Sequence, residues 1–212
     1  KDDQTLVELI LGRDLKCGAS LSSFRKVWGP DFCPDFPKML CESYNEKKIA
    51  KNVKFPAYSQ LKSDGARAQN VPENVTHRYA AGVYSRGGEV FGMLSHIQKD
   101  CETVFGNDFV VDGELVVLDQ DGEIMPRSIG NGILNKCIKG TAKLHEAMRV
   151  RFYIWDIIPV NEWSGREAVL FMKTRWKMLN DMIADANMIT SSLMVTECRV
   201  VNNLREARIH YQ

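Results

Sequence analysis

The sequence predicts a mixed α/β (α+β) fold in which short strands alternate with amphipathic helices. Two strongly apolar runs, Phe109–Leu118 and Arg151–Pro159, have the composition of buried strands. Apolar residues recur with helical spacing over 93–105 and again over 164–183. The 212 residues are enough for one packed domain, or for one domain and part of another.

The composition excludes several classes of protein. Hydrophobic residues make up 44% and charged residues 26% of the chain, as in ordinary globular domains. The formal net charge of +1 leaves no global basic field, so any surface for nucleic acid has to be local. The six cysteines form no Cys-x-x-Cys pair and the four histidines are scattered, which argues against a zinc site or a disulfide framework. Reduced thiols in a cytoplasm are expected, and no apolar run approaches the length of a membrane span.

The amino-terminal residues predict two short helices. The first covers 4–11, and the second begins after Ser20 or Ser22 and ends before Gly29. The proline-rich residues 31–37 are typical of a linker. Two short helices cannot bury a core of their own, so residues 1–36 are expected to be the end of a helical module, separate from 37–212.

Residues Gln60–Arg67 are the most informative stretch. A short strand over 55–59 is followed by Lys62 and then by the turn signal Asp64-Gly65. Free lysine has a pKa of about 10.4, and burial or a neighbouring positive charge lowers this pKa and exposes the lone pair. An uncharged Lys62 could then attack phosphorus or carbonyl carbon. The alternative is an ordinary hairpin turn.

The middle of the chain offers two further candidates, each with a plain alternative. A strand over 83–86 ends at two glycines, where Arg86 suits an anion or is a solvated turn arginine. The sequence Asp112-Gly-Glu114 lies between apolar segments, where a buried carboxylate is costly unless it is paired or used. The alternative there is a tight turn that leaves both acids in solvent. Residues 71–82 predict a hairpin or an exposed loop.

The remaining elements follow in order. Residues 119–122 predict a turn, and 128–140 a helix closed by Gly140, whose cations would face either a phosphate backbone or solvent: Arg127, Lys136 and Lys139. The aromatic Trp155 could stack on a base or belong to the core. A capping box at 164–167 predicts a long helix through 183, followed by a strand over 194–201 and a final helix capped by Asn202 or Asn203.

Four stretches occur in a fixed order: Lys62-x-Asp-Gly-x-Arg67, Ser85-Arg-Gly-Gly88, Asp112-Gly-Glu-Leu115 and Trp155-Asp-Ile-Ile-Pro159. Together they resemble the nucleotidyltransferase superfamily of ATP-dependent DNA ligases, and most closely the branch found in T-even bacteriophages. The resemblance continues outside these motifs, for example over 13–20, 52–57, 131–133 and 201–204.

The resemblance implies an ATP-grasp-like nucleotidyltransferase (adenylation) domain of antiparallel sheets flanked by helices over 37–212. Residues 1–36 would be the last helices of an all-α DNA-binding domain with a linker. The family's Glu-Gly and Lys-x-Lys motifs and its oligonucleotide-binding (OB) barrel have no counterpart in the sequence. The chain is therefore expected to be an incomplete portion of the enzyme that adenylates itself poorly.

The activity implied by the resemblance has three steps and requires ATP and Mg²⁺. Lys62 attacks the α-phosphorus of ATP, giving lysyl-AMP and pyrophosphate. The AMP passes to the 5′-phosphate at a nick in double-stranded DNA, and the 3′-hydroxyl then displaces it. A monomer in the cytoplasm, of the host cell if the source is viral, is the expected setting.

The resemblance also assigns the nucleotide-binding side chains. Arg67 and Glu114 would hold the ribose, and Glu114 would influence the metal. Trp155 would stack on adenine in place of the phenylalanine that many relatives carry. Gln60 would lie beside the purine.

Three further residues are assigned to the phosphates and the nick. Arg86 would contact the phosphate of the nick or of the nucleotide. Asp64 would act in the later steps, and Gly65 would allow the turn. The alternatives are an RNA ligase or an mRNA-capping-type nucleotidyltransferase, which the helical segment before Lys38 disfavours, and a non-catalytic nick-binding fragment.

Overall fold

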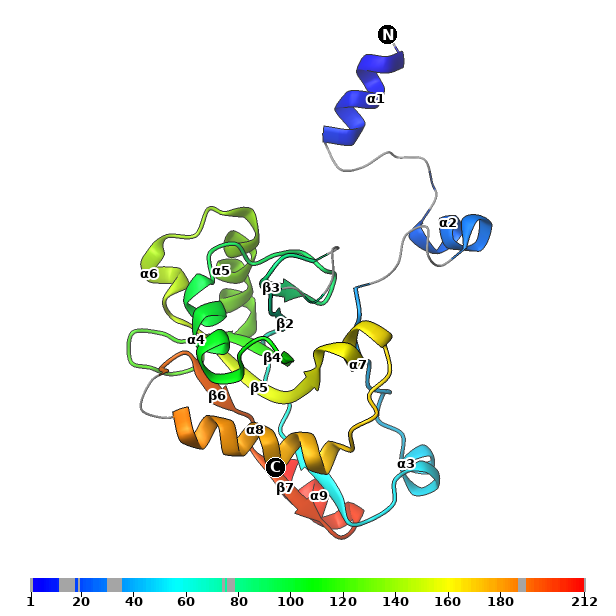
Figure 1. Ribbon diagram of the computed structural model, residues 1–212, viewed down its shortest axis with the longest axis vertical. Helices are drawn as coiled ribbons and strands as arrows, with labels where there is room; N and C mark the ends of the chain where they lie inside the picture. Colours follow the sequence, from blue (N-terminus) through cyan, green and yellow to red (C-terminus); the bar gives the residue numbers. More distant parts are fainter. Residues whose placement is uncertain are drawn as a thin grey trace. The chain divides into compact units, whose positions relative to one another are not determined.

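The computed structural model describes residues 2–11, 18, 20–29, 36–73, 75, 79–186 and 190–211 (Figure 1). The chain divides into two compact units, Lys1–Phe36 and Pro37–Gln212. The first unit contains helices α1 (Asp2–Leu11) and α2 (Leu21–Trp28), as predicted. Ser20 caps α2, because its hydroxyl accepts a hydrogen bond from the N–H of Ser23. The function of this unit stays a prediction, and most of the predicted linker lies outside the described residues.

The second unit contains two sheets. Their strands are β1 (Ala57–Gln60), β2 (Ala66–Val71), β3 (Gly82–Ser85), β4 (Phe109–Val117), β5 (Val150–Pro159), β6 (Leu193–Val195) and β7 (Cys198–Val201). Among the described residues, five strands form one sheet in the order β3-β2-β4-β5-β6, and β1 pairs with β7 in another. All pairs are antiparallel except β5 with β6. The predicted fold class is therefore confirmed, with one parallel pair that was not expected.

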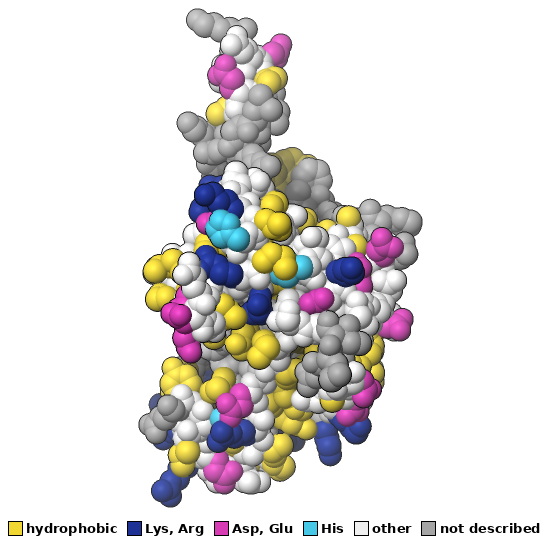
Figure 2. Space-filling model, turned by 90° about the vertical axis from the view of Figure 1, so that its left-hand side faces the viewer, with side chains coloured by type: hydrophobic (Ala, Val, Ile, Leu, Met, Phe, Trp, Pro, Cys, Tyr) yellow, Lys and Arg dark blue, Asp and Glu magenta, His cyan; other side chains and the backbone are white. Residues whose placement is uncertain are grey.

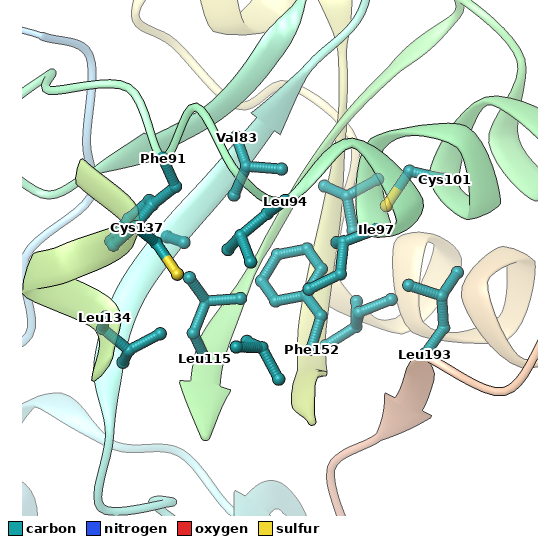
Figure 3. Packing of buried hydrophobic residues seen from close by; sticks show 14 of the residues in the cluster. Val83, Phe91, Leu94, Ile97, Cys101, Leu115, Leu134, Cys137, Phe152 and Leu193 are labelled. Carbon is teal, nitrogen blue, oxygen red and sulfur yellow. The ribbon is translucent and has the colours of Figure 1, made fainter. Parts of the chain in front are cut away.

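Helices cover the larger sheet. Besides α3 (Glu46–Asn52), the second unit contains α4 (Ser95–Phe105), α5 (Arg127–Lys139), α6 (Leu144–Ala147), α7 (Val160–Gly165), α8 (Met172–Ala186) and α9 (Leu204–Tyr211). Helix α4 packs on β3 and β6, α5 on β4, and α8 on β5. In Figure 3, Ile97 of α4 and Leu134 of α5 lie near Leu115 and Phe152 of the sheet. Burial of this apolar face drives the folding of the unit.

The sequence misplaced the helix expected over 164–183. Helix α7 ends at Gly165, Arg166 adopts a left-handed conformation (φ 60°), and α8 begins at Met172. The carboxylate of Glu162 accepts hydrogen bonds from the N–H groups of Val169 and Leu170. Glu162 thus satisfies two backbone N–H groups between α7 and α8, whereas the sequence predicted that a capping box at 164–167 would start one long helix.

The prediction of a single strand over 194–201 is also wrong, because this segment forms two strands. The chain pairs with β5 as β6, then leaves the larger sheet and pairs with β1 as β7. The N–H of Thr196 donates to the carbonyl of Ile154 in the larger sheet, and the carbonyl of Glu197 accepts from Leu61 in the smaller one. These bonds fix the crossover between the sheets.

The segment that contains Lys62 is not a hairpin. Strand β1 pairs with β7, whereas β2 pairs with β3 and β4, so residues 61–65 connect two different sheets. A hairpin does form after β2, where Val71 opposes Gly82. Gly140 ends α5 in the left-handed conformation, and the side chain of Asn203 accepts from the N–H of Glu206 at the start of α9, as predicted.

The surface agrees with the balanced composition. Acidic and basic side chains are interspersed on the face shown in Figure 2. Within the described ranges, every helix is too short or too polar to cross a membrane. The cysteines described by the structure are free thiols: Cys41, Cys101, Cys137 and Cys198.

Candidate active site

A cavity of about 860 Å³ lies where the two sheets meet. The end of β1, strands β2, β4 and β5, the loop after β3 and helix α5 all contribute to its wall. It brings together every residue that the sequence proposed for nucleotide binding, namely Gln60, Lys62, Gly65, Arg67, Arg86, Glu114 and Trp155. Asp64 does not line the cavity, but it pairs with Arg127, which does.

Lys62 lines this cavity from the segment 61–65, which joins β1 of the smaller sheet to β2 of the larger sheet. It is an exposed residue, and its Nζ donates to the carbonyl of Ser63 over 3.3 Å. The burial that the sequence analysis considered for this amine is therefore absent. Arg67, Arg86 and Arg127 line the same cavity.

Gly65 holds the Lys62 loop against β4. A Cβ at this position would lie 2.1 Å from the carbonyl oxygen of Leu115, so no larger residue fits without a backbone shift. The N–H of Gly65 donates to Oε1 of Glu114 over 3.2 Å. Gly65 is absent from the positive-φ glycines of the described chain, so close approach rather than turn conformation requires it.

A β-bulge directs Trp155 toward the cavity. Asp112 opposes Asp156 and Gly113 opposes Ile154, which leaves Trp155 without a partner on β4. Bulges bend a strand and re-aim its side chains, and they occur often beside active sites. The carbonyl of Trp155 accepts a hydrogen bond of 2.9 Å from Nε2 of Gln60, which links the two sheets at the cavity wall.

All three guanidinium nitrogens of Arg67 donate to protein groups. Its Nε and Nη2 donate to the two carboxylate oxygens of Asp112 over 3.1 and 2.6 Å, and its Nη1 donates to the carbonyl of Met39. The guanidinium also lies 5.7 Å from the ring centre of Trp155. Asp112 and Glu114 are only 1% and 5% exposed within the continuous strand β4. The alternative of a solvated acidic turn is therefore wrong.

The sequence did not reveal the buried polar network behind the site. Gln69 donates to Asp112 and accepts from the indole N–H of Trp163. Arg175 of α8 donates to both carboxylate oxygens of Asp156 over 2.8 Å. The signal available in the sequence was the acid within each apolar strand; the partners come from distant helices and strands.

Residues 39–41 were also missed. For the lysines of 38–54 the sequence predicts a solvated face, with phosphate contact as the alternative, and it makes no prediction for Met39, Leu40 and Cys41, which line the cavity. Nζ of Lys38 donates to the carbonyl of Arg86 over 3.2 Å, and Met39 accepts from Arg67. The apolar residues within a charged stretch were the only hint of this role.

Burial raises the pKa of the Glu114 carboxyl above its ordinary value. The opposing influences are, in decreasing order, the charge of Lys62, the N–H of Gly65 and the charges of Arg127 and Arg67. The Glu114 carboxylate thus lies within electrostatic reach of three cations of the site.

The pH dependence of stability should report this burial through the variant Glu114→Gln. A carboxyl whose pKa is raised on folding stabilises the protein fully below its unfolded pKa, near 4.5, and loses that contribution as the pH rises through the folded pKa. The amide keeps the acceptor for Gly65 but does not titrate. Urea unfolding at pH 4 and pH 7 should therefore show the variant gaining stability relative to the parent as the pH rises. A relative loss would contradict the raised pKa.

Comparison with known proteins is consistent with this geometry. The model of the ATP dependent DNA ligase domain matches residues 38–212. The DNA ligases of Enterobacteria phages T6 and T4 are each 32% identical to the chain, and the alignments cover 100% of this chain and 49% of each relative. The chain therefore spans about half the length of these curated relatives.

A solved structure, the ATP-dependent DNA ligase of bacteriophage T7 in complex with ATP, has a similar fold. Its TM-score is 0.59 at 18% identity, covering 80% of this chain and 57% of that one. The matched family model extends over most of the sequence, and both phage relatives align along its whole length. The chain belongs to the family of ATP-dependent DNA ligases.

Proposed function

We propose that this chain is the adenylating part of an ATP-dependent DNA ligase, which seals nicks in duplex DNA through lysyl-AMP and a DNA-adenylate. The observation that carries the proposal is one cavity that gathers Arg67, Glu114 and Trp155 from three strands of the larger sheet and Lys62 from the segment that joins the two sheets. An amine, a guanidinium, a carboxylate and an indole around one space of about 860 Å³ suit a nucleotide.

The wall of the cavity provides complementary groups for each part of ATP. The indole of Trp155 offers a flat face for adenine, with Gln60 bonded to the same stretch of backbone. Arg67 and Glu114 oppose each other across β2 and β4, so their side chains leave the same face of the sheet, where they are proposed to contact the ribose. Lys62 and Arg86 supply positive charge for the phosphates.

The chemistry begins with the amine of Lys62. Its Nζ loses a proton and forms a bond to the α-phosphorus while the bond to pyrophosphate breaks. A 5′-phosphate oxygen at the nick next takes the AMP from Lys62, and the 3′-hydroxyl then forms the phosphodiester as AMP leaves. Asp64, on the turn beside Lys62, is available for the later steps.

The residues fit Mg²⁺ only together with a substrate. No group of three or more His, Cys, Asp or Glu side chains in the described part of the chain is arranged to hold a metal. The cavity offers the carboxylates of Glu89 and Glu114. Mg²⁺ commonly binds through one or two carboxylates with substrate phosphates and water, and it would neutralise charge on the phosphates. Glu114 is the proposed ligand.

Sealing of a nicked duplex tests this function. The protein at its full natural length, with ATP and Mg²⁺, should join a 5′-phosphorylated nick in double-stranded DNA, as measured by the length of the labelled strand on a denaturing gel. In parallel reactions, nicked RNA replaces the nicked DNA, or GTP replaces ATP. Preferential joining of RNA, a requirement for GTP, or binding of nicked DNA without joining would overturn the proposal in favour of an RNA ligase, a capping-type enzyme or a non-catalytic fragment, respectively.

A further inference from the structure

We propose that Arg127, the first residue of α5, binds a substrate phosphate beside Lys62, and that Asp64 positions its guanidinium until that phosphate arrives. The inference rests on the proposed function and adds a phosphate-binding residue to it. In this proposal the substrate phosphate replaces Asp64 as the partner of Arg127.

The cations around the cavity differ in how far they are already engaged. Arg67 donates from all of its guanidinium nitrogens to Asp112 and Met39. Arg127 lines the same cavity, and among the described residues its side chain makes a single hydrogen bond, from Nη1 to Oδ1 of Asp64 over 3.2 Å. Most of the donors of Arg127 therefore remain available to a ligand.

The contact that holds Arg127 is easily exchanged. The side chains of Arg127 and Asp64 are 54% and 72% exposed, and exposed ion pairs of this kind contribute little to stability. An arginine that meets a phosphate can form two parallel charge-assisted hydrogen bonds, which are stronger than one bond to an exposed carboxylate. Asp64, on the Lys62 turn, would be released by the same exchange.

The surroundings place Arg127 near the reacting groups. Its charge acts on the buried carboxyl of Glu114 together with that of Lys62. Asn131, one turn further along α5, also lines the cavity, and its Oδ1 has no hydrogen-bond partner among the described residues. Helix α5 thus places a second polar group, the side chain of Asn131, in the cavity wall next to Arg127.

The three cations of α5, which the sequence did not distinguish, have different surroundings in the structure. Lys136 donates to the carboxylate of Glu146 over 2.8 Å. Lys139 is exposed and does not line the cavity, whereas Arg127 does. Lys139→Gln therefore removes the same charge from the same helix away from the site, which makes it the matched control.

Two substrates could supply the phosphate: the triphosphate of ATP, or a DNA phosphate at the nick. The full-length protein and its variants Arg127→Gln, Arg127→Lys and Lys139→Gln are compared in two reactions. The first is adenylation by ATP and Mg²⁺, followed by intact mass. The second is sealing of nicked duplex DNA that already carries the 5′-adenylate, without ATP.

Arg127→Gln is expected to slow at least one reaction by about tenfold or more. A defect in adenylation, with a raised KM for ATP, assigns the phosphate to ATP, and a defect in the second reaction assigns it to DNA. Arg127→Lys should recover part of the rate, because it keeps the charge but not the planar fork. Lys139→Gln should stay within about twofold of the parent in both reactions.

Rates for Arg127→Gln within about twofold of an active parent in both reactions would overturn the role of Arg127 and leave the proposed function intact. If the parent is inactive in both reactions, the proposed function fails. Binding then decides the role of Arg127: the dissociation constants of parent and Arg127→Gln for ATP and for nicked DNA are compared, and equality for both ligands overturns it, whereas weaker binding of either supports it.

Discussion

Replacement of Lys62 by alanine should abolish ATP-dependent nick sealing, with a loss of at least about 10³-fold. Lys62 supplies an amine to the cavity from the segment that joins β1 to β2, and the methyl group of alanine cannot accept AMP. The same variant should still seal DNA that already carries the 5′-adenylate, because the AMP has by then left the lysine. Gel assays of the two substrates measure both expectations.

Lys54→Ala is the matched control for this experiment. Lys54 is exposed and lies outside the cavity, so its loss should leave both reactions within about twofold of the parent. If Lys62→Ala sealed ordinary nicks with ATP at the parent rate, Lys62 would not be the carrier of AMP. Equal loss of both reactions would instead indicate that Lys62 mainly supports the structure or the final step.

Removal of Arg175 should cost about 3–5 kcal/mol of unfolding free energy, because it leaves the charge of Asp156 buried and uncompensated. The two side chains are 7% and 3% exposed, and Arg175 donates to both carboxylate oxygens. Asp156 immediately follows Trp155 at the β-bulge, so the pair also anchors the cavity wall. Urea unfolding of Arg175→Met measures the loss.

Two comparisons isolate the buried charge as the cause. Lys177→Met removes a cation from the exposed pair with Asp181 on the same helix and should change stability by no more than about 1 kcal/mol. The double variant Arg175→Met with Asp156→Leu should recover much of the loss, since apolar side chains can replace both members of a buried pair. A single variant Arg175→Met as stable as Lys177→Met would show that Asp156 does not depend on Arg175.

Local sequence patterns predicted most elements of the second unit. The apolar runs became β4 and β5, and the helical spacing over 93–105 became α4, which buries Ile97, Cys101 and Phe105. Such patterns work because a buried face requires apolar side chains at the period of the element.

The errors arose where residues outside the local pattern contribute to the structure. The capping-box sequence at 164–167 does not start the long helix, and the carboxylate of Glu162, which lies before it, binds the backbone at 169–170. The strand over 194–201 was divided because its second half pairs with β1, more than a hundred residues earlier in the sequence. Local propensity contains no information about either partner.

The candidate site shows the same distinction. The motif residues were recognisable as chemistry, and the structure brings all of the proposed nucleotide-binding residues to one cavity. The structural reason for each residue could not be predicted from the sequence. Gly65 is required because its Cα lies close to the carbonyl of Leu115, and a β-bulge orients Trp155. Residues 39–41, which also line the cavity, offered only the weak signal of apolar side chains in a charged stretch, because the contact of Met39 with Arg67 joins residues far apart in the sequence.

The position of a covalent AMP shows whether Lys62 carries the nucleotide. The full-length protein is incubated with ATP and Mg²⁺, digested with a protease, and its peptides are sequenced by mass spectrometry. We predict a single adenylated side chain, Lys62, on the segment that joins β1 to β2. An AMP group on another residue, or none after incubation under conditions in which the protein seals nicks, would show that Lys62 is not the carrier of AMP.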